Sequence, residues 1–160
     1  MPQSLIHQIQ HENDRWRTLI YYVMNENVLL KTRLAQVLLK QDDKKFLEKA
    51  EKFLTRFLDL DHEISHLRAH LAELTCLVTE SNQNADDILN IKHTLIYFRR
   101  NILLTERHLS KLRLEFYEFL YSFFEKEKSE LIGFSMPDSS QDVPMETIFL
   151  LTEEQLYKKF

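Results

Sequence analysis

The sequence predicts an all-α protein, an antiparallel bundle of three long, coiled-coil-like helices. Apolar residues recur at alternating steps of three and four along most of the chain, whereas a strand would need alternation by two. Residues that break helices are scarce, since the 160 residues include one glycine, Gly133, and three prolines. We expect helices at about 4–40, 43–80 and 85–132, joined by short loops.

The first helix is expected to begin at Ser4, whose hydroxyl can cap it. Its ladder of ten positions consists of Ile6, Ile9, Asn13, Trp16, Ile20, Val23, Asn27, Leu30, Leu34 and Val37. A polar residue at such a position commonly fixes the register of a bundle. We expect Asn27 to bond Thr105 or His108, because an unpaired buried amide costs about 1–3 kcal/mol. Asn13 lies nearer the open end, where water can reach it.

The second helix follows "KQDDKK" (40–45), whose aspartates can cap it. Its ladder is entirely apolar and consists of Phe46, Ala50, Phe53, Phe57, Leu60, Ile64, Leu67, Leu71, Leu74 and Val78. Ten apolar positions in succession predict a helix that is buried along one whole side.

The third helix follows the polar loop "ESNQNADD" (80–87), in which Asn84 or Asp86 can act as the cap. Its ladder contains one polar residue, Thr105, and consists of Ile88, Ile91, Leu95, Phe98, Ile102, Thr105, Leu109, Leu112, Phe116, Phe119 and Phe123. We expect Asn13, Asn27 and Thr105 together to form the polar, register-setting part of the core.

Short loops between antiparallel helices also predict which ladder positions meet. Folding at the second loop places Phe46 level with Phe119. Folding at both loops places Asn27 level with Phe57 and Leu109.

The chain is expected to form one bundle over residues 1–133, followed by a tail over 134–160. The segment 135–145 contains two prolines and predicts a connector. A short C-terminal helix is expected to begin at Thr152, with a capping box to Gln155. The tail could cover its own bundle, or bind a protein partner on another chain.

The segment His62-Glu63-Ile64-Ser65-His66 matches H-E-x-x-H, the zinc-protease pattern. The phase of the ladder nevertheless places His62 at heptad position f, Glu63 at g and His66 at c, away from the apolar seam. A zinc site needs a sheltered cleft and a third ligand. We therefore expect no catalytic residue, metal or cofactor, and keep a metal-dependent protein or hydrolase using His62, Glu63 and His66 as the alternative.

Composition limits the remaining functions. The net charge is −4 with no basic face, which disfavours nucleic-acid binding. A single glycine rules out a glycine-rich phosphate loop, and the one cysteine, Cys76, is expected to be an inert thiol. No apolar run reaches the roughly 18 residues of a membrane span, and the N-terminus lacks a signal-peptide core. A cytoplasmic protein is the resulting expectation.

The third helix carries more apolar residues than its ladder uses. The surplus recurs at position b, with further members at c and f: Leu89, Ile96, Tyr97, Leu103, Leu104, Tyr117, Tyr121, Phe124 and Leu131. Leu103, Tyr117, Tyr121, Phe124 and Leu131 are the predicted interface. We therefore expect a non-enzymatic protein that acts through protein–protein contact, as a homodimer through the third helix.

Overall fold

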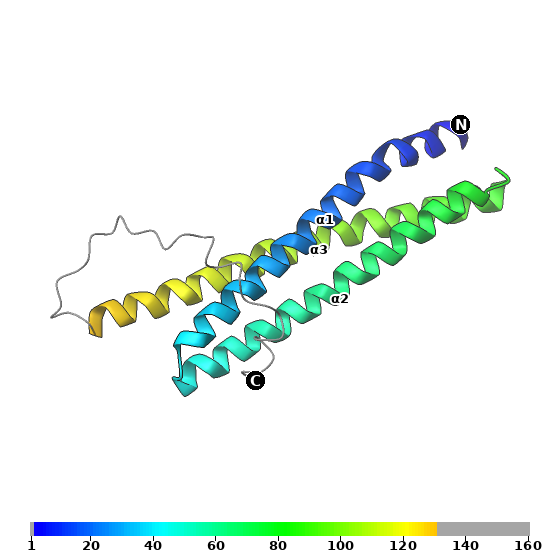
Figure 1. Ribbon diagram of the computed structural model, residues 1–160. Coiled ribbons are helices and arrows are strands. Elements are labelled where there is room, and N and C mark those ends of the chain that lie inside the picture. The colour runs from blue at the N-terminus through cyan, green and yellow to red at the C-terminus, as the bar shows by residue number, and fades with distance from the viewer. Residues whose placement is uncertain (1, 131–160) are drawn as a thin grey trace. The chain divides into compact units, whose positions relative to one another are not determined.

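The structure, a computed structural model, describes the backbone of residues 2–130 and the side chains of residues 4–125. It consists of three helices, α1 (Pro2–Lys40), α2 (Lys44–Glu80) and α3 (Ala85–Glu130), which are coloured along the chain in Figure 1. The described part contains no strand. The predicted all-α fold of three helices is therefore confirmed. Leu131, the connector at 135–145 and the expected C-terminal helix lie outside the described residues.

The residues that the sequence predicted as helix caps lie at the starts of α2 and α3. Asn84 caps α3, because its Oδ1 accepts a hydrogen bond from the Asp87 backbone nitrogen at 2.8 Å. Asp43 stands immediately before α2, and its carbonyl accepts from the Leu47 nitrogen at 3.0 Å. With no glycine in the second loop, Gln83 takes the left-handed conformation at φ 58°. A side chain is less favourable there than glycine would be.

The chain forms two compact units, and each helix contributes to both. Among the described residues, unit 1 comprises 2–27 and 58–109, whereas unit 2 comprises 28–57 and 110–130. The two units are described separately below.

The core of unit 1 is built around the single tryptophan. Trp16 is buried and meets Phe98 edge-to-face, with ring centroids 5.0 Å apart. The Arg99 guanidinium lies 6.0 Å from the Trp16 ring and pairs with Glu12 at 3.1 Å. These contacts join α1 to α3, and α2 covers the same core with a buried row of Leu60, Ile64, Leu67, Leu71 and Leu74.

The core of unit 2 is a set of stacked phenylalanines on α2 and α3. The rings of Phe46 and Phe119 stack at 5.1 Å, as the loop position predicts. Phe57 and Phe116 are fully buried and meet edge-to-face at 5.2 Å. Phe53 lies between these two pairs and contacts both Phe116 and Phe119. Aromatic pairs in these geometries contribute about 0.5–1.5 kcal/mol each beyond their buried area.

In unit 2, α1 departs from its predicted ladder. Val37 is only half-buried, whereas Leu38 is fully buried, as is most of Lys31. A straight helix drifts about 20° per heptad against a seven-residue repeat, so the four heptads from Ile9 to Val37 accumulate about 80°. That drift is close to the roughly 100° between neighbouring residues, so the buried position moves forward by one residue.

Candidate functional site

The outer face of α3 carries the predicted interface residues. In unit 1, Leu89, Ile96 and Leu103 recur every seven residues and are 54%, 66% and 55% exposed; we call these three residues the α3 stripe. All three occupy heptad position b, which points away from a core built on positions a and d. Tyr97 and Leu104 are exposed beside them.

In unit 2, the corresponding face of α3 exposes Leu114, Tyr121 and Phe124, at 61%, 67% and 45%; we call these three residues the α3 patch. A hydrogen bond to the Glu125 carboxylate raises the pKa of the Tyr121 phenol, with a smaller contribution from the charge of that carboxylate. The phenol is therefore neutral at pH 7, and its ring is an uncharged apolar surface.

Tyr117, also predicted at the interface, is less available than Tyr121. It is half-buried, and the Arg33 guanidinium of α1 lies 5.0 Å from its ring centroid. A cation over an aromatic face is attracted by the ring electrons. Arg33 gives no apolar signal in the sequence, so heptad phase alone could not find this contact.

Exposed apolar surface is unevenly divided among the three helices. Of the twelve large apolar side chains exposed in the described part of the chain, eight lie on α3, four on α1 and none on α2. Scattered single apolar residues are normal on a protein surface, so the feature that distinguishes α3 is the number of exposed apolar residues that it carries.

The H-E-x-x-H residues do not share one site. His62 is exposed, whereas Glu63 and His66 line a groove of about 490 Å³ between α2 and α3 in unit 1. His70 and His108 line the same groove. Its walls run antiparallel, because Glu63 contacts His108 whereas His70 contacts Tyr97, further back along α3.

Glu63 already has a partner in this groove. The His108 Nδ1 lies 2.8 Å from both carboxylate oxygens of Glu63. The His66 and His70 rings lie 6.4 Å apart, and the His70 Nδ1 is buried without a hydrogen-bond partner among the described residues. Within the described part of the chain, no three His, Cys, Asp or Glu side chains are placed to hold a metal ion. The sequence pattern pointed to His66 but not to the groove, because His70 and His108 come to line one groove with it only when α2 and α3 pack.

The polar residues of the ladder lie inside the bundle. Asn27 is 0% exposed, and Thr105 is also buried. The Asn27 Nδ2 donates a hydrogen bond of 2.7 Å to the Asp61 Oδ1, whereas we expected Thr105 or His108 as its partner. Asp61 lies one turn beyond Phe57, the residue expected at the level of Asn27. Asn13 is half-buried, and its Oδ1 accepts no hydrogen bond from the described residues.

Comparison with known proteins adds no functional parallel, because no family model, curated protein or solved structure matches this chain. None of the described helices has an apolar segment long enough to cross a membrane.

Proposed function

We propose that this is a non-enzymatic helical-bundle protein that forms a homodimer through the outer face of α3. The observation that carries the proposal is the concentration of exposed large apolar side chains on α3, compared with none on α2 among the described residues. Homodimer interfaces are more apolar than the rest of a protein surface and are enriched in aromatic residues such as tyrosine and phenylalanine. A two-fold dimer would bury the same surface of both copies.

The expected strength follows from the exposed area. Burying a fully exposed Leu, Ile or Phe side chain contributes about 1.5–3 kcal/mol, so a half-exposed one contributes roughly 1 kcal/mol. Replacing the three residues of the α3 stripe with glutamate therefore removes about 3 kcal/mol of association free energy per copy. Both copies of the dimer carry the substitutions, so the loss is about 6 kcal/mol per dimer, which is about 10,000-fold in Kd. The α3 patch has similar exposure and the same expected effect.

The experiment measures the oligomeric state of the wild-type protein and of three variants by sedimentation velocity and light scattering. The first replaces the α3 stripe with glutamate, the second replaces the α3 patch, and the control replaces Val28 and Leu39, which are exposed apolar residues of α1. Circular dichroism checks that helix content is unchanged. We expect a wild-type dimer that either α3 variant dissociates and the control preserves. A wild-type protein that is monomeric at micromolar concentration overturns the proposal.

A cytoplasmic location and a further protein contact through residues 134–160 belong to the same proposal. Support for the contact comes from the apolar run Ile148, Phe149, Leu150 and Leu151 in the sequence of that segment. The net charge of −4 argues against nucleic acid as the partner.

A further inference from the structure

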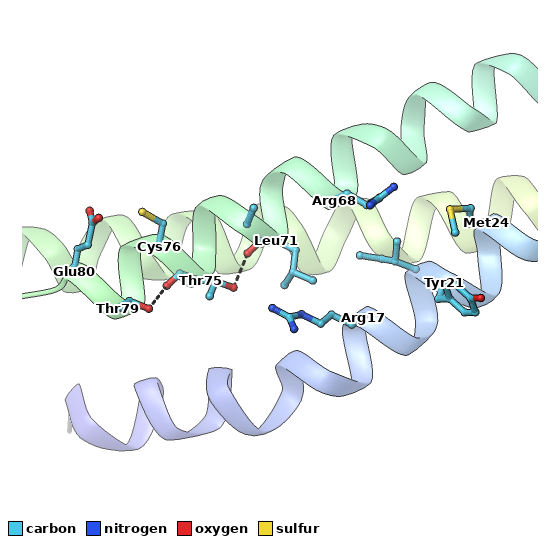
Figure 2. A pocket seen from close by; sticks show the side chains of 11 residues that line it. Arg17, Tyr21, Met24, Arg68, Leu71, Thr75, Cys76, Thr79 and Glu80 are labelled. Carbon is cyan, nitrogen blue, oxygen red and sulfur yellow. Dashed lines mark hydrogen bonds between the residues drawn. The ribbon is translucent and has the colours of Figure 1, made fainter.

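A second surface, independent of the α3 face, lies between α1 and α2 in unit 1. It is an open pocket of about 710 Å³ lined by the eleven residues drawn in Figure 2. Ile20 and Leu71 belong to the buried core, and Met24 and Ala72 extend this apolar lining on either side. The pocket therefore has the apolar lining typical of small-ligand sites, whose volumes are about 300–1,000 Å³.

Two arginines are the only cations among the described residues that line the pocket. Arg17 comes from α1 and Arg68 from α2, and neither forms an ion pair or hydrogen bond with another described residue. Asn27 of α1 is level with Asp61 of α2, because the two side chains are hydrogen-bonded. The helices run antiparallel, so Arg17, ten residues before Asn27, is level with Leu71, ten residues after Asp61. Arg68 lies one turn before Leu71 on the same helix. Figure 2 shows Arg17 reaching from α1 towards α2 below Leu71, whereas the Arg68 side chain points away from Arg17.

Three other polar side chains of the pocket already have hydrogen-bond partners within the protein. The hydroxyls of Thr75 and Thr79 donate to the carbonyl oxygens of Leu71 and Thr75, each at 2.8 Å, as the dashed lines in Figure 2 mark. Glu80 accepts a hydrogen bond from the Cys76 thiol, which raises the pKa of that thiol. Glu80 is twelve residues beyond Arg68 on α2, about 18 Å along the helix, so the negative end of the pocket is remote from the positive one.

We infer that this pocket binds a single-chain anionic amphiphile from solution, such as a fatty-acid carboxylate. Arg17 and Arg68 are both exposed, so their side chains can turn toward the pocket and donate charge-assisted hydrogen bonds to the carboxylate, which are strong. The hydrocarbon chain extends along Leu71, Ala72 and Thr75, and repulsion by Glu80 fixes its direction. A folded protein partner fits less well, because a specific protein interface uses about 20–30 residues on each side.

The single cysteine of the chain provides a direct readout. Cys76 is exposed and lines the pocket, so a bound hydrocarbon chain shields its thiol. The full-length protein is treated with N-ethylmaleimide, an uncharged reagent, at mildly alkaline pH with and without monomeric dodecanoate. Dodecyltrimethylammonium, which has the same chain and the opposite charge, is the matched control ligand. Titration calorimetry measures affinity independently of the thiol.

Dodecanoate is expected to slow Cys76 modification, whereas the ammonium compound leaves the rate unchanged. Arg17→Gln and Arg68→Gln each weaken dodecanoate binding about 10-fold or more, because each loses a hydrogen bond to a charged group. Arg100→Gln, on the exposed surface of α3, leaves binding unchanged. Ala72→Phe fills the pocket and abolishes the calorimetric signal.

Three results overturn the inference. In the first, dodecanoate gives neither protection nor heat of binding. In the second, the ammonium compound binds as tightly as dodecanoate, which means that the apolar surface adsorbs any detergent. In the third, binding requires vesicles of anionic lipid and is absent with monomeric dodecanoate, which assigns the arginines to a membrane surface instead.

Discussion

The hydrogen bond between Asn27 and Asp61 tests how the core of unit 1 is specified. Asn27 is fully buried, and its Nδ2 lies 2.7 Å from the Asp61 Oδ1. Replacing Asp61 with alanine removes a charged acceptor from a buried donor. Hydrogen bonds to charged groups contribute about 1.5–3 kcal/mol, and because Asp61 is half-buried we expect a loss of about 2 kcal/mol in the free energy of unfolding. For a chain of this size such a loss lowers the melting temperature by about 4–8 °C.

Two further substitutions separate the bond from the charge. Asp59→Ala removes an exposed carboxylate from the same helix and is expected to change stability by less than about 0.5 kcal/mol. Asn27→Leu replaces the buried amide with an apolar side chain of similar size, which is often tolerated or stabilising when a buried polar group is removed whole. The double variant Asn27→Leu, Asp61→Ala should therefore be more stable than the two single effects predict, with a coupling energy of about 1–2 kcal/mol.

Urea unfolding followed by tryptophan fluorescence is the appropriate assay. Trp16 is the only tryptophan and is buried against Phe98 in unit 1, so its emission reports on the unit that contains Asn27 and Asp61. The reasoning is refuted if Asp61→Ala is no less stable than Asp59→Ala. An additive double variant would show that the two side chains do not interact.

Three other predictions use equally specific readouts. Phe98→Ala should cost about 3–5 kcal/mol in urea unfolding, because it opens a cavity beside the single tryptophan; a loss below about 1 kcal/mol contradicts the packing described. Glu80→Gln should lower the pKa of Cys76 towards its ordinary value, since the carboxylate holds it up, so alkylation at a fixed pH below that value becomes faster; an unchanged pH–rate profile contradicts this. Protein purified without a histidine tag should contain substoichiometric zinc and iron by elemental analysis, and neither His62→Ala nor His66→Ala should alter that content. Stoichiometric metal that is lost in His66→Ala would establish the metal-dependent alternative.

The apolar ladders predicted α2 most fully. Nine of its ten ladder residues are buried, and the half-buried Phe53 stacks within the phenylalanine core of unit 2. The stacking of Phe46 on Phe119 followed from loop length and helix rise alone. Such features depend on periodicity and chain geometry, which one sequence contains in full.

Contacts made by flanking polar side chains could not be predicted in the same way. Asp61, Arg33 and Lys31 have charged side chains whose identity suggests solvent, yet Lys31 is buried and the other two contact neighbouring helices. A long or charged side chain at a flanking position has several possible partners within reach, and the packing of the helices determines which of them it contacts. The open pocket beside Arg17 was missed for the same reason, because it depends on how far α1 and α2 separate rather than on any residue pattern.

The geometry of α3 explains why its exposed apolar residues cannot join the three-helix core. With about 100° between successive residues, positions b and f lie roughly 130° and 170° from the centre of an a/d seam. No adjustment of helix packing within a three-helix bundle brings both the seam and these positions into one core. The α3 stripe is therefore a surface that the three helices have no means of covering, whereas α2, with the same fold constraints, places no large apolar side chain there. A second copy that presents the same stripe supplies the missing apolar surface at both sites at once, and for this reason we favour self-association through α3.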